Sequence, residues 1–405
     1  METISIQRLA AGGDGFGAQI FAPLTLPGER VRGAIADGRM ETPEILAPSP
    51  HRIRPSCPHF GVCGGCALQH ADDAFLAGWK RDRIALALAA RGIEGAEIRA
   101  TVTSPAQSRR RAGFAARRTR KTVIAGFHVR AGDGLVPIES CDVIAPALLK
   151  ALEPMRAAAR LGASRQGEIR GLATLSDAGV DLAIEGAKPL ERAMSEDAAT
   201  LAAAHDLARL SWNGEIVAAR RAPAQRFGSA LVTPPPHAFL QATAAGEAAL
   251  VVAAREAVGG ARRIADLFAG CGAFSLPLAD TAEILAVEGD PAMIDALRAG
   301  WRAAPRLKKI VAVSRDLFRR PLTAAEFAGL DAVVIDPPRA GAAAQSAELA
   351  KGGPPRVAAL SCNPATFARD ARTLIDGGYR LDWVLPVDQF RWSPHVELAA
   401  QFHRD

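Results

Sequence analysis

The stretch RRIADLFAGCGAFSLPLA, residues 262–279, decides which fold this chain is expected to adopt. Its first half is an apolar run that predicts a buried strand. Gly270 and Gly272 follow this run, and glycine lets a backbone turn tightly and approach a ligand closely. A helix is expected directly after the turn. A glycine pair alone is weak evidence for a nucleotide site, so its meaning depends on the surrounding sequence.

The sequence after this stretch alternates between apolar runs and helical patterns. Buried strands separated by helices indicate a mostly parallel sheet with helices on both faces, which is a Rossmann-like α/β fold. The proline-rich segment TPPPHAF precedes the pattern, and we expect this domain to span residues 236–405. The further strands are expected in EILAVEGD (283–290), KKIVAVSRD (308–316), LDAVVIDPP (330–338), RVAALSCNP (356–364), YRLDWVLPV (379–387) and VELAAQFHR (396–404).

Two acids are expected at the carboxyl edge of this sheet, where open α/β sheets bind ligands. Glu288 ends the second strand and Asp336 ends the fourth. A carboxylate after the second strand can accept hydrogen bonds from ribose hydroxyls. An NAD enzyme would show nearly the same pattern, but the segment DPPRAG, which begins at Asp336, gives a rigid turn at this edge. Together the motifs resemble a class I methyltransferase that uses S-adenosyl-L-methionine.

Cys362 is the candidate reacting residue. It follows the fifth expected strand in LSCNPATFARD, so it lies at the same edge of the sheet. A cysteine that ends a strand is more often a small core residue, and Cys271, between the two glycines, is interpreted in that way. The N-terminus of the helix after Pro364 is expected to lower the pKa of the Cys362 thiol and to favour the nucleophilic thiolate.

Several motifs together resemble the RNA uridine-5-methyltransferase family. They are FLQ, DPPRAG, SCNPATFARD and a final histidine-x-glutamate. The segment CPHFGVCGGCALQH, residues 57–70, is similar to the iron–sulfur members that methylate large-subunit (23S) ribosomal RNA. The likeness covers nearly the whole chain. The family usually has asparagine where Ala273 stands, and proline where Arg391 follows Phe390.

The resemblance implies a covalent mechanism. C5 of uracil is a poor nucleophile, so Cys362 would first add to C6, and Glu397 would finally remove the C5 proton. Gln241 and Asp336 would line the pocket for the cofactor and the target base. The turn at Gly270 and Gly272 would approach the cofactor, and three further residues would contact it: Phe268, Glu288 and Asp316, which would receive the adenine amine. We therefore expect methylation of C5 of a specific uridine in 23S rRNA.

Four cysteines form a candidate metal site. Cys57, Cys63 and Cys66 lie within ten residues, and Cys141 of ESCD fits as the fourth ligand. Thiols stay reduced in the cytosol, so clustered cysteines there bind metal more often than they form disulfides. Four thiolates suit zinc or a [4Fe–4S] cluster equally well by count. The family resemblance favours the cluster, in a structural or RNA-positioning role.

The sequence before the catalytic domain divides into two further regions. The pattern of residues 1–50 predicts short strands and turns, which is typical of a small OB-like barrel. These residues also resemble the TRAM module of the 23S rRNA subgroup. Residues 51–235 are expected to form a central α+β domain that carries the iron–sulfur cysteines. Within this region, the segment of residues 71–102 contains an amphipathic helix that we expect to dock on the catalytic domain.

Charge and composition indicate a cytoplasmic RNA-binding protein. The chain has 405 residues and a formal net charge of +6. Its densest basic run, SRRRAGFAARRTRK (108–121), carries seven positive charges and no negative one. Such a run is either a solvated strand face or a stripe that contacts phosphates. We expect no membrane contact, because the N-terminus lacks a signal-peptide pattern and no apolar run is long enough to span a bilayer.

Three alternatives remain to the prediction that the protein methylates a uridine in 23S rRNA. The target could be a uridine in transfer RNA, which would be favoured if the barrel does not fold. The chain could also be a non-catalytic RNA-binding protein on a methyltransferase scaffold, although the presence of both Cys362 and Glu397 argues against this. A small-molecule methyltransferase would need neither the basic run nor the barrel. We expect the protein to act as a monomer.

Overall fold

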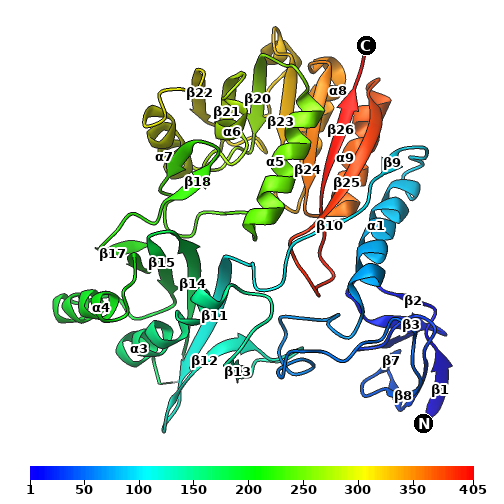
Figure 1. Cartoon of the computed structure of the whole chain (residues 1–405), viewed down its shortest axis with the longest axis vertical. Helices are drawn as coiled ribbons and strands as arrows, with labels where there is room; N and C mark the ends of the chain where they lie inside the picture. Colours follow the sequence, from blue (N-terminus) through cyan, green and yellow to red (C-terminus); the bar gives the residue numbers. More distant parts are fainter. Residues whose placement is uncertain (166) are drawn as a thin grey trace.

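The computed structural model describes residues 1–165 and 167–405. Figure 1 shows three regions along the chain: small N-terminal sheets in blue, a central sheet in cyan and green, and a C-terminal α/β domain from green to red. None of the described helices combines the length and the continuous apolar character of a membrane span.

The N-terminal region consists of two small sheets that share a compact core. Ile4, Ile6, Ala22, Val31 and Met40 are buried together in it. The arrangement is consistent with the predicted small barrel. One sheet has the order β1 (Glu2–Ser5), β5 (Arg30–Gly33) and β8 (Glu44–Ala47), and the other has the order β2 (Arg8–Leu9), β3 (Gly15–Gly17), β4 (Ile20–Ala22), β7 (Arg39–Met40) and β6 (Ile35–Ala36).

The central region is built on a seven-stranded sheet in which only β15 and β16 pair in parallel. Its order is β13 (Leu135–Pro137), β12 (Val123–His128), β11 (Arg111–Arg118), β14 (Glu168–Ser176), β15 (Gly179–Glu185), β16 (Arg209–Trp212) and β17 (Glu215–Ala219). The helices α2 (Pro146–Leu149), α3 (Leu152–Gly162) and α4 (Arg192–Ala204) contribute side chains to its core.

The alanine-rich segment after residue 195 is only partly helical. The sequence pattern predicts one helix through residues 195–210, but α4 ends at Ala204 and Arg209 already lies in β16. The chain reverses at Asp206, which has a φ of +51°. All four residues of β16 are buried, with β15 on one side and β17 on the other. Strand pairing in the tertiary structure therefore overrides the helical propensity of this run.

Helix α1 (Asp73–Ala89) joins the central region to the catalytic domain. Its N-cap Asp72 accepts a hydrogen bond from the Phe75 backbone N–H at 2.7 Å. Its apolar face packs with α9 and β25, and Ile84 and Leu88 belong to one core of the catalytic domain. Figure 1 shows the helix beside this domain. The strands β9 (Glu97–Ile98) and β10 (Val102–Thr103) then pair with β25.

The C-terminal domain has the predicted Rossmann-like α/β fold. Its sheet continues from β10 in the order β25 (Arg380–Asp388), β26 (Glu397–His403), β24 (Arg356–Ser361), β23 (Ala332–Ile335), β20 (Arg263–Leu267), β21 (Glu283–Glu288) and β22 (Ile310–Ser314). The strands β20 to β24 are parallel, whereas β26 is antiparallel to both neighbours. The hairpin of β18 (Gln225–Phe227) and β19 (Ala230–Val232) packs on helix α7.

Helices cover both faces of this sheet, and each strand contributes alternate side chains to the two cores. In β23, Val334 belongs to one core and Val333 to the other. The first core includes residues of α5 (Ala244–Val258), α6 (Ser275–Leu278) and α7 (Pro291–Arg302). The second includes residues of α1, η1 (Ala324–Phe327), α8 (Ala343–Gly352) and α9 (Pro364–Asp376). The carboxyl ends of the parallel strands lie at one edge of this layered core.

Candidate active site

A cavity of about 570 Å³ lies at the carboxyl ends of the parallel strands. Of the nine residues predicted from the sequence for catalysis and cofactor binding, eight line it. They are Gln241, Phe268, Gly270, Glu288, Asp316, Asp336, Cys362 and Glu397. Gly272 is not among the described residues of the lining. The cavity thus brings together side chains that are up to 156 positions apart in the sequence, from Gln241 to Glu397.

The turn after β20 forms one side of the cavity. Gly270 has a φ of +54°, and its backbone N–H donates a hydrogen bond of 3.0 Å to Oε2 of Glu288. The other oxygen of Glu288 accepts from the Asp290 N–H at 2.9 Å. Gly272 lies behind the turn, where an added Cβ would be 3.0 Å from side-chain atoms of Leu276 and Leu297. The first glycine therefore lines the ligand site and the second permits close packing.

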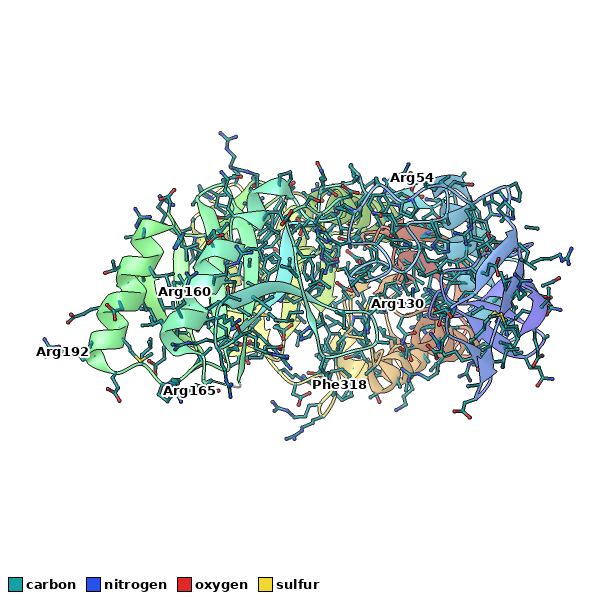
Figure 2. All side chains as sticks on the ribbon, turned by 90° about the horizontal axis from the view of Figure 1, so that it is seen from below. Arg54, Arg130, Arg160, Arg165, Arg192 and Phe318 are labelled. Carbon is teal, nitrogen blue, oxygen red and sulfur yellow. The ribbon has the colours of Figure 1, made fainter. Side chains whose placement is uncertain are left out.

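Two phenylalanines form the neighbouring wall. Phe268 has a φ of +62°, and its ring centroid lies 5.4 Å from that of Phe318. The Phe318 side chain, visible at the edge of the molecule in Figure 2, is exposed. Oδ1 of Asp316 accepts a hydrogen bond from the Phe318 backbone N–H at 2.9 Å. This wall offers an apolar surface beside a carboxylate, which suits a base with an exocyclic amine.

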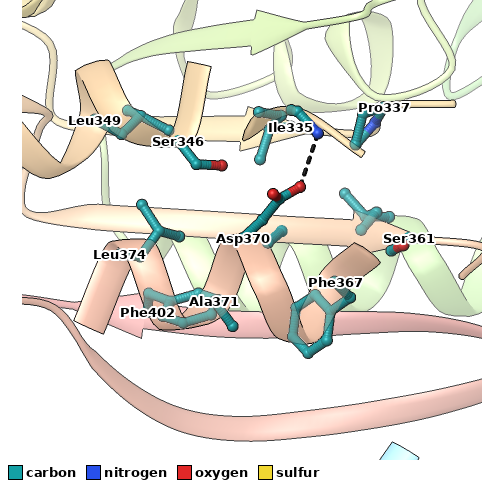
Figure 3. A pocket seen from close by; sticks show the side chains of 13 residues that line it. Ile335, Pro337, Ser346, Leu349, Ser361, Phe367, Asp370, Ala371, Leu374 and Phe402 are labelled. Atoms are coloured by element: carbon teal, nitrogen blue, oxygen red, sulfur yellow. Dashed lines mark hydrogen bonds between the residues drawn. The ribbon is translucent and has the colours of Figure 1, made fainter. Parts of the chain in front are cut away.

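The DPPRAG turn is fixed from below by helix α9. Oδ2 of Asp370 accepts a hydrogen bond from the Ala342 N–H at 2.7 Å, and Figure 3 shows Asp370 pointing from the helix toward the turn. The carbonyl of Arg339 accepts hydrogen bonds from Asn363 at 3.1 Å and from Thr366 at 3.2 Å. The space under the turn measures about 20 Å³, which is room for roughly one water molecule and not for a substrate.

Cys362 follows β24 directly and lies one residue before Asn363, the N-cap of α9. The predicted lowering of its pKa is wrong. Burial raises the pKa of the thiol, and the nearby carboxylates of Glu397 and Asp336 raise it further, whereas Arg339 opposes them. The N-terminus of α9, which Asn363 caps by accepting from the Ala365 N–H, does not outweigh the effects of burial and of the two acids. The thiol therefore needs deprotonation within the occupied site.

Glu397 is the first residue of β26, and its side chain is buried. Burial raises its pKa to about 8, and Asp336 adds to this, while Gln389 and Arg109 act in the opposite direction. Burial also raises the pKa of Asp336 to about 7. Both acids therefore exchange protons near neutral pH, which is the property that general acid–base catalysis requires.

The four cysteines predicted as metal ligands line a second cavity of about 410 Å³. Arg339, Phe390 and His395 line both this cavity and the first one. Within residues 1–165 and 167–405, no three His, Cys, Asp or Glu side chains come close enough together to hold a single metal ion. Cys271, in contrast, is buried in the apolar core, as the sequence indicates for a packing residue.

The basic run of residues 108–121 is not one exposed stripe. Arg110 forms an ion pair with Glu247 and donates to the Gln241 carbonyl at 3.2 Å. Arg109 points inward over the ring of Phe390. Of its basic residues, Arg118, Arg120 and Lys121 are exposed, around the β11–β12 turn. The first arginines therefore fasten the central region to the catalytic domain.

Sequence reasoning missed several residues that line the first cavity. Phe239 and Phe318 are large apolar side chains that are more than half exposed at its mouth. Arg339 belongs to the DPPRAG motif, and its guanidinium lies 3.2 Å from Nδ1 of His395. Phe239 belongs to the FLQ motif and Arg339 to DPPRAG, so both residues could have been predicted. Met293 and Phe318 carry no comparable signal.

Comparison with known proteins identifies the family. Residues 234–404 match the sequence profile of the tRNA (Uracil-5-)-methyltransferase family. An uncharacterized RNA methyltransferase of Caulobacter vibrioides is 44% identical, and the alignment covers 100% of both chains. The 23S rRNA (uracil(1939)-C(5))-methyltransferase RlmD of Chromohalobacter salexigens is 34% identical over 99% of this chain and 89% of that protein. This chain belongs to the RNA (uracil-5-)-methyltransferase family.

A solved structure has the same fold as this protein over almost the entire length of both chains. The crystal structure of the Pyrococcus abyssi tRNA (uracil-54, C5)-methyltransferase covers 99% of both chains with a TM-score of 0.76 and 22% identity. The similarity at this identity concerns the fold alone. It includes the N-terminal and central regions, and the enzyme class of this protein, an RNA (uracil-5-)-methyltransferase, rests on the sequence relatives.

Proposed function

We propose that this methyltransferase modifies C5 of a specific uridine in 23S rRNA through a covalent bond between Cys362 and C6 of the base. The observation that carries the proposal is the convergence of Cys362, Glu397, Asp336 and Gln241 on one cavity. The glycine turn and Glu288 line the other part of the same cavity, where S-adenosyl-L-methionine would supply an electrophilic methyl group.

Cys362 carries the first step of this mechanism. Its thiolate adds to C6 of the uracil, and the electrons of the C5=C6 bond move onto the C4 carbonyl to give an enolate. C5 would then have the nucleophilic character that it lacks in free uracil and would attack the methyl group, whose bond to the sulfonium sulfur would break so that S-adenosyl-L-homocysteine leaves. One difficult substitution is in this way divided into two easier steps. Arg339, whose positive charge opposes the raised pKa of the thiol, favours the thiolate.

Glu397 carries the last step. After methylation, C5 holds both its original proton and the new methyl group. The Glu397 carboxylate takes the proton, the electrons re-form the C5=C6 bond, and the Cys362 thiolate leaves C6. A base with a pKa near the working pH is suited to this transfer, and the pKa of Glu397 is raised to about 8 by burial.

The comparison with RlmD supports 23S rRNA as the substrate, because its identity of 34% extends over 99% of this chain. The N-terminal strands also fold, but the structure of the Pyrococcus abyssi tRNA methyltransferase covers this region as well, so the N-terminal region does not distinguish the two substrates. A transfer-RNA uridine is the second candidate, favoured by the description of the family profile. A non-catalytic RNA-binding role fits less well, because the thiol and the buried acid face one cavity.

Incubation with labelled S-adenosyl-L-methionine tests the substrate. We expect label in 5-methyluridine at one position of an unmodified 23S rRNA transcript, with little label in a pool of unmodified tRNA transcripts. Mass mapping of nuclease fragments locates the methyl group. Preferential label in tRNA would transfer the assignment to the second candidate. A protein that binds both RNAs and methylates neither would be a non-catalytic binder.

We propose further that Cys57, Cys63, Cys66 and Cys141 hold a [4Fe–4S] cluster. All four line one cavity, and four cysteine thiolates are the usual ligand set of a [4Fe–4S] cluster. The similarity of residues 57–70 to the iron–sulfur members of the family favours the cluster over zinc. When bound, it would fix the cysteine segment against β12, to which Gly64 is hydrogen-bonded.

Metal analysis tests this ligand set. Protein purified without oxygen should contain about four iron atoms and matching acid-labile sulfide per chain, with broad visible absorption. Cys141→Ser should lose most of the iron, because one of the four ligands is removed. Cys271→Ser is the matched control and should keep it, since Cys271 lies in the apolar core. One zinc per chain without sulfide would contradict the cluster.

A further inference from the structure

Both polar atoms of the Gln389 side chain are hydrogen-bonded, and two of their partners, Gln241 and Glu397, line the active-site cavity. Gln389 follows β25 directly, and its side chain is only 1% exposed. Its amide nitrogen donates one hydrogen bond to Oε1 of Gln241 at 2.7 Å and another to Oε2 of Glu397. Its amide oxygen accepts from the Thr243 backbone N–H at 3.1 Å. Gln389 is not among the described residues that line the cavity, so it would act through its neighbours.

The Thr243 contact determines which way this amide faces. A backbone N–H can only donate, so the atom of Gln389 that faces Thr243 must be the oxygen. The nitrogen therefore faces Gln241 and Glu397. The Gln241 amide is oriented in turn, with its oxygen toward Gln389 and its nitrogen 3.3 Å from Oδ2 of Asp336. The chain of hydrogen bonds runs in one direction from Thr243 to Asp336.

The surroundings hold Gln389 in this place. The preceding Asp388 forms a buried ion pair of 2.6 Å with Lys80 of α1. On the opposite side, a Cβ added to Gly246 would lie 2.2 Å from Cγ and 2.5 Å from Cδ of Gln389. Gly246 therefore leaves the space that the glutamine fills. The ion pair thus anchors the residue that precedes Gln389, and the glycine leaves room for the Gln389 side chain itself.

We propose that Gln389 is a positioning residue that presents Glu397 to the reacting base and turns the nitrogen of Gln241 into the cavity. The inference rests on the proposed role of Glu397 as the base. With Oε2 held by Gln389, the second oxygen of Glu397 is the one available for the C5 proton. The nitrogen of Gln241 offers a hydrogen-bond donor, which matches a carbonyl oxygen of uracil and not the exocyclic amine of cytosine.

The pH dependence of adduct release separates this role from a structural one. Glu397 must be ionised to accept the proton, and its pKa is about 8, so release by the wild type should become faster as the pH rises toward 8. The charged or titratable groups that act on Glu397 are Asp336 and Arg109, and the Cys362 thiol is also within electrostatic reach. None of these is changed in the variants below.

Gln389→Met removes both hydrogen-bond donors at nearly constant side-chain volume. The loss of one hydrogen bond to the Glu397 carboxylate should raise its pKa by roughly one to two units. The pH dependence of adduct release should therefore shift to higher pH by the same amount. Release at pH 7 should therefore fall by about tenfold to a hundredfold. Gln345→Met is the matched control, because Gln345 is equally buried and hydrogen-bonds Leu322 in both directions at 2.9 Å. The control should lose stability and keep the wild-type profile.

Gly246→Ala places a methyl group where the Gln389 side chain lies. It should therefore shift the pH dependence of adduct release in the same way. This second variant tests the proposal if Gln389→Met does not fold. A folded Gln389→Met or Gly246→Ala enzyme with the wild-type profile would overturn the positioning role while leaving the proposed function intact. A wild type that methylates uridine without a covalent adduct would instead overturn the mechanism on which the inference rests.

Discussion

The Cys362→Ala enzyme is expected to bind S-adenosyl-L-methionine normally and to transfer no measurable methyl group to RNA. The hydrogen bonds that join Glu288 to the backbone of Gly270 and Asp290, and the ring contact of Phe268 with Phe318, do not involve the thiol. C5 of the uracil would remain a poor nucleophile, because no group adds to C6. Loss of a covalent nucleophile typically costs on the order of 10⁴-fold or more in kcat. Calorimetric titration of the cofactor and a filter assay with labelled methyl measure the two effects separately.

Cys271→Ala is the matched control for this experiment. Cys271 is also a free cysteine of the catalytic domain, but it is buried in the apolar core. Its truncation should lower the free energy of unfolding by roughly 1 kcal/mol and leave methyl transfer within a fewfold of wild type. Retention of activity within about tenfold by Cys362→Ala would remove Cys362 as the nucleophile.

Glu397→Gln should trap the covalent intermediate. Addition of the Cys362 thiolate and methylation of C5 do not use Glu397 to accept the C5 proton, but expulsion of Cys362 requires that this proton leave. The enzyme should therefore accumulate in a denaturation-resistant complex with RNA that carries the labelled methyl group. Proton transfer by a positioned base typically contributes about 10²–10⁴-fold, so slow release by water should still occur over hours. Denaturing gel electrophoresis with labelled cofactor measures both the yield and the decay.

The free energy of unfolding of Glu397→Gln provides a second test of the role of Glu397. Burial raises the pKa of Glu397 to about 8, so its ionisation opposes folding increasingly as the pH rises from the ordinary glutamate value toward 8. Above pH 8, the free energy of unfolding of Glu397→Gln should therefore be no lower than that of the wild type. Glu247→Gln is the control, because it breaks a buried ion pair with Arg110 and should destabilise without trapping RNA. Normal turnover by Glu397→Gln, or inactivity without a methylated adduct, would contradict the assignment.

The sequence by itself determined the C-terminal fold and most of the candidate site. Each buried strand appears as a short apolar run, and parallel strands place their carboxyl ends at one edge. Residues that follow different strands, such as Glu288, Asp336 and Cys362, were therefore predicted to meet, and they line one cavity. The chemistry of this edge depends on residue type and strand order, which are both local properties of the sequence.

Only the tertiary structure decided the ionisation and the orientation of these groups. The pKa of Cys362 is raised, against the effect expected from its helix, because burial and two carboxylates from other strands surround the thiol. Arg110 faces Glu247, 137 positions away, and not solvent. Gln389 reaches Gln241 across 148 positions. Desolvation and charge–charge interaction depend on distance in space, and a linear sequence does not record which distant side chains share one small volume.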